Sequence, residues 1–320
     1  MRFTMRLDPS GATSASDQYA AALEIAERAD AAGAMALVVS EHHASDDGYL
    51  PSPLVVASAM AARTSRIHIA VAALLALFYD PVRLAEDLAV LDVLSRGRVS
   101  CTLGVGYRPE ELAMYGVEPA TRGDRMEELI GFLRAAWSGD EVEHPTRGRM
   151  RITPTPTTPG GPLLMYGGHT KAAARRAARC QMLLQAETED VSLRDVYEAE
   201  AARVGVAPVG CMIVAPGTSS VTFVAPDVDA AWDELGPYLL NDAERYAAWN
   251  EGRTGIVSID AARSTDELRR GGSYAILSFD EAAERQASGA GVVLDPLCGG
   301  LPPAVAHRYF DHALAASAAR

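Results

Sequence analysis

The chain has 320 residues, a length that suits one large α/β barrel or two modest domains. Its 29 Lys and Arg residues against 42 Asp and Glu residues give a formal net charge of −13, and no basic block stands out, which argues against nucleic-acid and anionic-membrane partners. With 48% hydrophobic residues and a mean hydropathy of +0.01, the chain has ample apolar material for a buried core and is not a disordered protein.

The start of the chain and its cysteines favour a cytoplasmic protein. No apolar stretch follows the first basic residues, so we expect no secretory signal, and the longest apolar run, 69–79, is well short of the roughly 20 residues of a membrane helix. The four cysteines are far apart and form no CxxC pair, which predicts neither a metal site nor a redox motif. We expect reduced, mostly buried thiols and no membrane segment.

Short apolar runs rich in branched residues alternate with Ala-rich segments whose charges recur at helical spacing, a pattern typical of parallel sheets. The first half is expected to form a strand at 2–7, a helix at 16–32 capped by Ser14 or Ser16 and ended by Gly33, a strand at 36–40, a helix at 53–64, a strand at 67–75, a helix at 81–94, a strand at 98–103 and a helix at 122–137. The second half is expected to form a strand at 163–166, a helix at 170–178, a strand at 181–185, a helix at 193–204 and strands at 209–215 and 291–294. Eight strand candidates with interleaved helices, and no linker rich in Gly or Ser, favour one (β/α)₈ TIM barrel over residues 1–320.

Two stretches fit this alternation less well. Residues 141–162 contain five prolines, a density that excludes helix and central strand and predicts a long irregular excursion. Residues 221–275 read as an insertion before the last βα unit, with an extra strand at 221–224 and a helix at 227–250.

The densest group of polar residues follows the second expected strand, where Glu41, His42 and His43 precede Asp46 and Asp47. Catalytic residues of such barrels lie at the carboxyl ends of strands. Histidines flanked by carboxylates can hold an imidazole ready to donate or accept a proton, so the candidate catalytic residues are His42 and Glu41. A structural hydrogen-bond network is the alternative, and a metal site is disfavoured because adjacent strand residues point to opposite faces.

Two later strand ends carry pairs of glycines. After the fourth strand, Gly104 and Gly106 would let a flat ligand approach the backbone, although a plain tight turn is an equal contender. This is not a dinucleotide fingerprint, because Pro109 stands where the third glycine belongs and no helix is expected to begin directly there. After the fifth strand, Gly167 and Gly168 precede a helix.

The helix after Gly167 and Gly168 is a candidate phosphate site. The free N–H groups and the dipole of a helix start favour an anion, and Thr170 can serve as both cap and hydroxyl donor. An ordinary Gly-rich turn is the alternative, and Arg175 and Arg176 are expected to be solvated or salt-bridged.

The segment 294–303 follows the last expected strand and contains three prolines and two glycines. We interpret it as a rigid wall of the active site. Cys298 lies within it, but no neighbouring sequence feature lowers the pKa of a thiol there, so a nucleophilic role is not expected.

Several segments in this order resemble the luciferase-like flavin monooxygenase superfamily, the bacterial luciferase fold class, which also contains deazaflavin-dependent oxidoreductases. The resemblance covers most of the chain. It is carried by Glu41-His42-His43 with Gly48-Tyr49-Leu50-Pro51-Ser52-Pro53, by Asp80-Pro81-Val82-Arg83 with 84–87, by Ser95-Arg96-Gly97-Arg98 after 91–92, by Gly104-Val105-Gly106-Tyr107, and by the terminal segment 296–303.

The resemblance implies a flavin bound at the carboxyl ends of the barrel strands, with His42 matching the catalytic histidine and Glu41 beside the isoalloxazine ring. The residues it implies for cofactor binding are Ala72 and Ala73, which match a non-prolyl cis peptide under the ring, Gly104, Val105 and Tyr107 near the ring, and Tyr166, Gly167, Gly168, His169 and Thr170 at the phosphate turn.

Two positions depart from luciferase, because Val105 stands in place of an arginine against the phosphate and Gly104 in place of a reactive cysteine. Deazaflavin enzymes of the class often carry Asp-His where this chain has Glu41-His42, which favours FMN. The expected activity is therefore a two-component monooxygenase that uses O2 and reduced FMN from a separate flavin reductase on a small organic substrate.

Two other functions stay open. One is hydride transfer with the deazaflavin coenzyme F-420, with His42 or Glu110 as the proton partner. The other is a non-catalytic flavin-binding or partner subunit, which the presence of Glu41 and His42 disfavours. The resemblance also implies a homodimer, and the Ala-rich face of 54–62 is a candidate contact.

Overall fold

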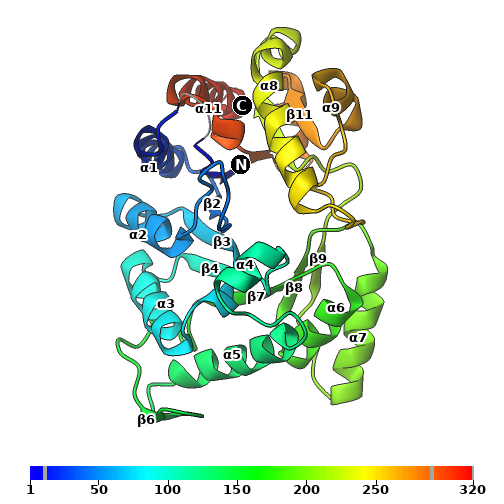
Figure 1. The fold of residues 1–320 in the computed structure, drawn as a ribbon. Coiled ribbons are helices and arrows are strands. Elements are labelled where there is room, and N and C mark those ends of the chain that lie inside the picture. Colours follow the sequence, from blue (N-terminus) through cyan, green and yellow to red (C-terminus); the bar gives the residue numbers. More distant parts are fainter. Residues whose placement is uncertain (10–12, 289–291, 319–320) are drawn as a thin grey trace. The chain divides into compact units, whose positions relative to one another are not determined.

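The computed structural model describes residues 1–9, 13–288 and 292–318 (Figure 1). The chain forms two compact units: unit 1 is Met1–Val39, His43–Pro51 and Val214–Arg320, and unit 2 is Ser40–His42 and Ser52–Ile213. All eight predicted strands form, most of them shorter than expected, and Gly291 of the last one lies outside the described residues. A single domain over 1–320 stays a prediction, and each unit is described by itself.

Unit 2 contains a sheet of five parallel strands, flanked by helices that precede or follow them in the chain (Figure 1). In sheet order the strands are β3 (His68–Leu74), β4 (Val99–Leu103), β7 (Leu163–Gly167), β8 (Leu183–Ala186) and β9 (Cys211–Ile213). The long helices are α2 (Pro53–Arg63), α3 (Pro81–Ser95), α5 (Arg122–Ala136), α6 (Lys171–Arg179) and α7 (Ser192–Val204). Every residue of β4 is buried, as expected of a central parallel strand covered on both faces.

Two features of unit 2 differ from the sequence expectations. The excursion at 141–162 contains a short antiparallel hairpin, β5 (Val142–His144) and β6 (Gly148–Met150), with Gly148 at φ +76 beside the turn. Beyond β4, a short helix α4 (Pro109–Met114) begins only three residues after Gly106, so the expectation that no helix begins there was wrong. Proline is well suited to the first helical position, because the backbone N–H that it lacks would have no partner within the helix there.

One arginine joins the elements at the amino end of β4. Arg98 donates hydrogen bonds to the carbonyl oxygens of Ala61, Thr64, Ile67 and Ser95 and to the hydroxyl of Thr64. These acceptors belong to the ends of α2 and α3 and to the segment between α2 and β3. The guanidinium thus satisfies carbonyl groups that the helix ends leave unpaired.

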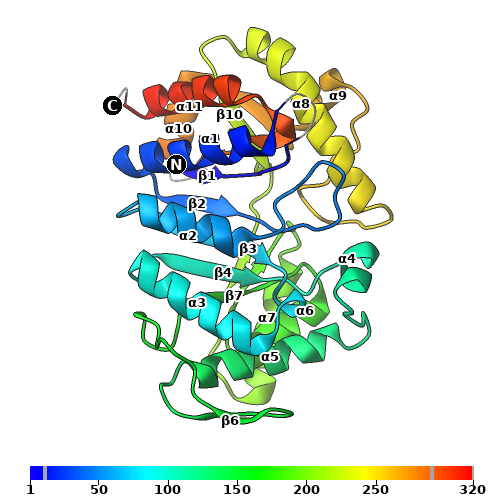
Figure 2. The same ribbon diagram turned by 60° about the vertical axis from the view of Figure 1, so that its left-hand side comes forward.

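The strands of unit 1 pair in parallel in two groups, to which β1 (Arg2–Thr4), β2 (Ala36–Val39) and β10 (Val221–Val224), labelled in Figure 2, belong. In the first group, β1 pairs with β2 on one side and β12 (Val293–Leu294) on the other; in the second, β10 pairs with β11 (Tyr274–Leu277). The helices are α1 (Ala15–Ala31), α8 (Val228–Trp249), α9 (Thr265–Gly271), α10 (Phe279–Ala287) and α11 (Pro303–Ala318), and the short helices of the two units are η1 (Ala76–Phe78) and η2 (Cys298–Gly300).

The core of the predicted insertion forms around α8. Trp232, Leu235 and Leu239 recur at helical spacing and pack with Phe223 of β10 and Ile276 of β11. The predicted strand at 221–224 and helix at 227–250 are confirmed within one residue at each end. Across the described residues, no helix combines the length and apolar character needed to cross a bilayer.

Candidate active site

His42 lies in unit 2 and is almost fully buried. Its Nδ1 atom is 2.9 Å from Oε1 of Glu111, and its ring meets the ring of Tyr107 edge-on, with centroids 5.7 Å apart and an interplanar angle of 83°. Tyr107 and Glu111 both come from the segment that follows β4. The histidine is therefore held by a carboxylate and an aromatic ring from one stretch of chain.

Glu111 was not singled out in the sequence; the neighbouring Glu110 was expected to be the proton partner. In the structure Glu110 is exposed on α4, whereas Glu111 is fully buried against His42. Arg108, also buried, donates from Nη1 to the same Oε1 of Glu111 over 3.1 Å. Reading Pro109 as the first residue of a helix would have distinguished the two glutamates, because consecutive helical residues point in different directions.

Glu41 is buried and holds the segment after β3. Its Oε2 atom accepts a hydrogen bond from the backbone N–H of Leu75 (2.7 Å), and its Oε1 atom accepts one from the hydroxyl of Tyr79 (3.0 Å). Burial and the negative charge of Glu41 raise the pKa of Tyr79, so this phenol stays protonated. The structure thus gives Glu41 a positioning contact, and its place beside a cofactor ring stays a prediction.

The ends of β3 and β4 form a surface of small residues. The Ala72–Ala73 peptide bond is cis, as the resemblance implied. The N–H of Gly104 donates to the carbonyl oxygen of Leu74 (2.8 Å), and a Cβ atom added at Gly104 would lie 3.2 Å from Cβ of Ala73. Ala72, Ala73, Gly104 and Val105 are all half-buried, so a planar group could lie against their backbone.

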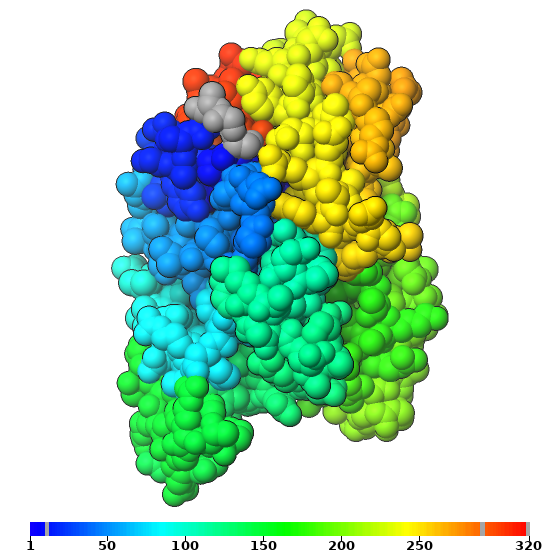
Figure 3. Space-filling view, in the orientation of Figure 1, coloured from blue at the N-terminus to red at the C-terminus, as the bar shows by residue number. Residues whose placement is uncertain are grey.

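A stacked aromatic pair lies close to Gly106, where an added Cβ atom would be 3.3 Å from the ring of Phe78. The rings of Phe78 and Tyr115 are 4.5 Å apart and tilted by only 6°. Burial and the negative charges of Glu41 and Glu111 raise the pKa of Tyr115. The neighbouring Met114 is 62% exposed, and α4 lies on the surface visible in Figure 3.

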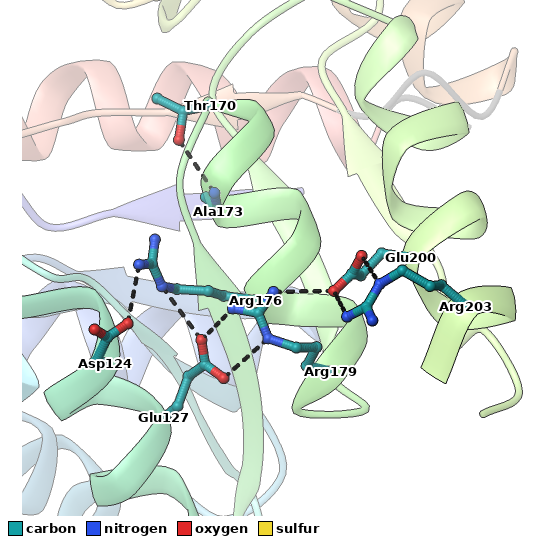
Figure 4. Close-up of polar contacts among 8 residues, drawn as sticks. All are labelled: Asp124, Glu127, Thr170, Ala173, Arg176, Arg179, Glu200 and Arg203. Carbon is teal, nitrogen blue, oxygen red and sulfur yellow. Dashed lines mark hydrogen bonds and ion pairs between the residues drawn. The ribbon is translucent and has the colours of Figure 1, made fainter. Parts of the chain in front are cut away.

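The turn between β7 and α6 carries the predicted phosphate-binding residues. Tyr166 is fully buried, Gly168 has φ +151, and the Gly168 N–H donates to the carbonyl oxygen of Gln185 (3.2 Å). Thr170 is the N-cap of α6, and its hydroxyl accepts from the N–H of Ala173 (3.1 Å), which confirms the predicted cap (Figure 4). Half-buried His169 precedes the cap, so all the residues predicted here lie on one turn.

Two of the three arginines of α6 form ion pairs with neighbouring helices. Arg176 pairs with Asp124 and Glu127 of α5, and Arg179 bridges Glu127 to Glu200 of α7 (Figure 4). Arg175 is exposed, so the expectation that Arg175 and Arg176 are solvated or salt-bridged is confirmed.

These residues fit a flavin phosphate and ring system. The first turn of α6, all of whose residues are described, carries no acidic side chain that would repel an anion. A Cβ atom added at Gly168 would lie 2.7 Å from Cβ of Ala173, so only glycine leaves this turn open. Val105 supplies no charge, so an anion here would rely on the start of α6.

Cys298 belongs to unit 1 and is fully buried in η2. Burial, followed by the charges of Asp242 and Asp295, raises the pKa of its thiol well above the usual range. The prediction that Cys298 is not a nucleophile is consistent with this environment. The role of the segment 294–303 as an active-site wall stays a prediction.

Comparison with known proteins places these features in a family context. The model of the family described as luciferase-like monooxygenase matches residues 2–292. The oxygenase component of the flavin-dependent trigonelline monooxygenase of Acinetobacter baylyi is 30% identical over 128 residues, which are 39% of this chain and 35% of the relative.

Two of the solved structures that match nearly the whole chain illustrate its fold. The monooxygenase RslO1 from Streptomyces bottropensis is 22% identical with a TM-score of 0.75, and the match covers 98% of each chain. The oxygenating constituent of 3,6-diketocamphane monooxygenase from Pseudomonas putida, solved in complex with FMN, is 18% identical with a TM-score of 0.67 over 98% of this chain and 94% of the other. These likenesses confirm the predicted fold class, an α/β chain of the (β/α)₈ TIM-barrel type.

Proposed function

The chain belongs to the luciferase-like monooxygenase family and is an oxidoreductase, and we propose that it is the oxygenase component of a two-component system that uses reduced FMN and O2 on a small organic substrate. The observation that carries the proposal is the buried His42, joined to Glu111, in the unit that also presents the small-residue surface at Ala73 and Gly104.

FMN would supply the redox chemistry, and the residues of unit 2 would bind and orient it. Ala72, Ala73 and Gly104 would lie against the ring, because their side chains are too small to occupy that space. The turn at 168–170 would hold the phosphate, with its N–H groups and the Thr170 hydroxyl as donors. His42 would hold or move a proton next to the ring.

A separate reductase would supply the reduced flavin. The trigonelline relative is named as an oxygenase component, and a complex with FMN is known for the diketocamphane enzyme, which supports FMN as the cofactor of this chain. A cytoplasmic location would suit both the reductase and the reduced thiols of the chain.

We also propose a homodimer that uses the outer faces of α2 and α3. These helices pack against one another in unit 2 and expose the apolar side chains of Val55, Val90, Val93 and Leu94. Exposed aliphatic side chains on two adjacent helices would be covered in such a contact. Sedimentation of the purified chain would show twice the chain mass, and a monomer at micromolar concentration would contradict the dimer.

The test of the cofactor and reaction is a binding titration of the purified protein with FMN and with coenzyme F-420, each oxidised and anaerobically reduced. Tight binding of reduced FMN, with O2 consumption that depends on the protein, is the expected result. Preference for F-420 with turnover that persists without O2 would refute the oxygenase and support hydride transfer. Binding of neither cofactor would refute both reactions.

A further inference from the structure

We propose that Glu111 and Arg108 form a positioning pair that fixes the tautomer and the ring orientation of His42, so that His42 exchanges protons through Nε2 alone. The inference deepens the proposed function and rests on it for the identity of the reaction. The arrangement itself is a property of the folded chain and can be observed without any flavin.

The contact between His42 and Glu111 sets which ring nitrogen carries hydrogen. A carboxylate only accepts hydrogen bonds, so the 2.9 Å contact at Oε1 of Glu111 requires an N–H at Nδ1 of His42. In the neutral imidazole the other nitrogen, Nε2, then keeps its lone pair and can accept a proton. In the imidazolium form, the hydrogen at Nδ1 stays bonded to Glu111, so proton transfer takes place at Nε2.

Arg108 holds the carboxylate in place. Its Nη1 atom donates over 3.1 Å to the same Oε1 atom that receives the His42 hydrogen bond. Arg108 immediately precedes α4 and Glu111 lies in its first turn, so the two side chains are three residues apart and lie on one side of the helix start. Both side chains are buried, and a buried carboxylate needs such a partner to stay in its position.

The ring plane of His42 has a second constraint from the same segment. Tyr107 meets the imidazole edge-on, one residue before Arg108. The five residues after Gly106, 107–111, therefore provide the hydrogen bond to the imidazole, the ionic partner of the carboxylate and the packing of the ring. Hydrogen-bond partners fix the tautomer and ring orientation of metal-binding histidines in the same way.

The decisive measurement is ¹⁵N NMR of the imidazole groups in protein labelled only at histidine. The chain has 7 histidines, and the His42→Gln variant assigns the signals of His42. We expect the neutral Nδ1–H tautomer in the wild-type protein. We expect the preference to be lost in Glu111→Gln, because an amide can donate to Nδ1 as well as accept from it. Glu110→Gln removes a charge one residue away on the exposed side of α4 and is expected to leave the His42 signals in place.

The wild-type spectrum alone can overturn the proposal. A neutral His42 with its hydrogen on Nε2 would refute it, whether or not any variant folds. An unchanged tautomer in folded Glu111→Gln would also refute it, because the pair would then contribute only packing.

Kinetics give a second, independent readout. With the reaction established by O2 consumption, Glu111→Gln is expected to lower kcat about ten- to a hundred-fold while the KM for the organic substrate and the affinity for reduced FMN stay within about two-fold. A change in KM with kcat retained would contradict a positioning role. If the protein failed to react with reduced FMN and O2, the proposed function would fall, whereas the NMR result would still decide the role of Glu111 and Arg108.

Discussion

Replacing Asp295 by Asn is expected to stabilise the protein in a way that depends on pH. Asp295 follows β12 in unit 1 and is only 2% exposed, and among the described residues its Oδ2 atom has no hydrogen-bond partner. Burial raises the pKa of this carboxyl from 3.8 to about 7; the positive charge of Arg6 opposes the shift and the negative charge of Asp242 adds to it. Ionised Asp295 is therefore a cost to the folded state.

The size and sign of the effect follow from this pKa. The folded protein binds the proton at Asp295 more tightly than the unfolded chain does, so the contribution to stability is fully present below about pH 4 and is lost as the pH rises to about 7. Each pKa unit corresponds to about 1.4 kcal/mol of folding free energy, so the stability lost by about pH 8 is roughly 4 kcal/mol. About 3 kcal/mol of this loss occurs between about pH 5 and about pH 8. Asn is nearly isosteric and cannot ionise.

The assay is urea unfolding of the wild type and Asp295→Asn at a series of pH values, with the free energy of unfolding extrapolated to water. The difference between the two proteins should grow by about 3 kcal/mol in favour of the variant between about pH 5 and about pH 8. An unpaired amide at the Oδ2 position would cost about 1–3 kcal/mol at every pH, so the slope and not the offset is diagnostic. Burial also raises the pKa of Asp8 well above its usual value, which adds the same trend to both proteins. A difference that does not vary with pH would refute the reasoning.

Three further substitutions test the site and its frame. His42→Ala should lower turnover by about 10²–10⁴-fold, or roughly 3–5 kcal/mol, with nearly unchanged FMN affinity, and wild-type rates would remove His42 from the mechanism. Gly168→Val should weaken FMN binding, because its side chain would meet Ala173 in a turn where φ is +151; unaltered affinity in a titration would place the phosphate elsewhere. Arg98→Met should lower the free energy of unfolding by about 3 kcal/mol, because it removes the hydrogen-bond donors to the ends of α2 and α3. A loss below about 1 kcal/mol in a urea titration would show that water replaces these donors.

The alternation of apolar runs and Ala-rich segments was sufficient to predict the eight parallel strands and most helices. Period-2 and period-3.6 patterns reflect local burial, which the sequence encodes directly. Caps were also predictable where a side chain bonds its own helix, as Ser14 and Thr170 do. The short helix α4 and the hairpin at 142–150 were missed because neither buries a periodic apolar face of sufficient length.

Some residues of the candidate site were identified from the sequence, and others only from the tertiary structure. His42, Glu41 and the glycine turns were identified from the sequence, because strand ends concentrate polar and flexible residues. Only the tertiary structure shows that Glu111, and not Glu110, contacts His42. Glu111 and His42 are 69 positions apart in the chain. The environment that sets the pKa of Asp295 also depends on tertiary structure. Arg6 and Asp242 lie far from Asp295 in the chain and approach it only in the folded unit. A local sequence pattern carries no information about such contacts between distant segments.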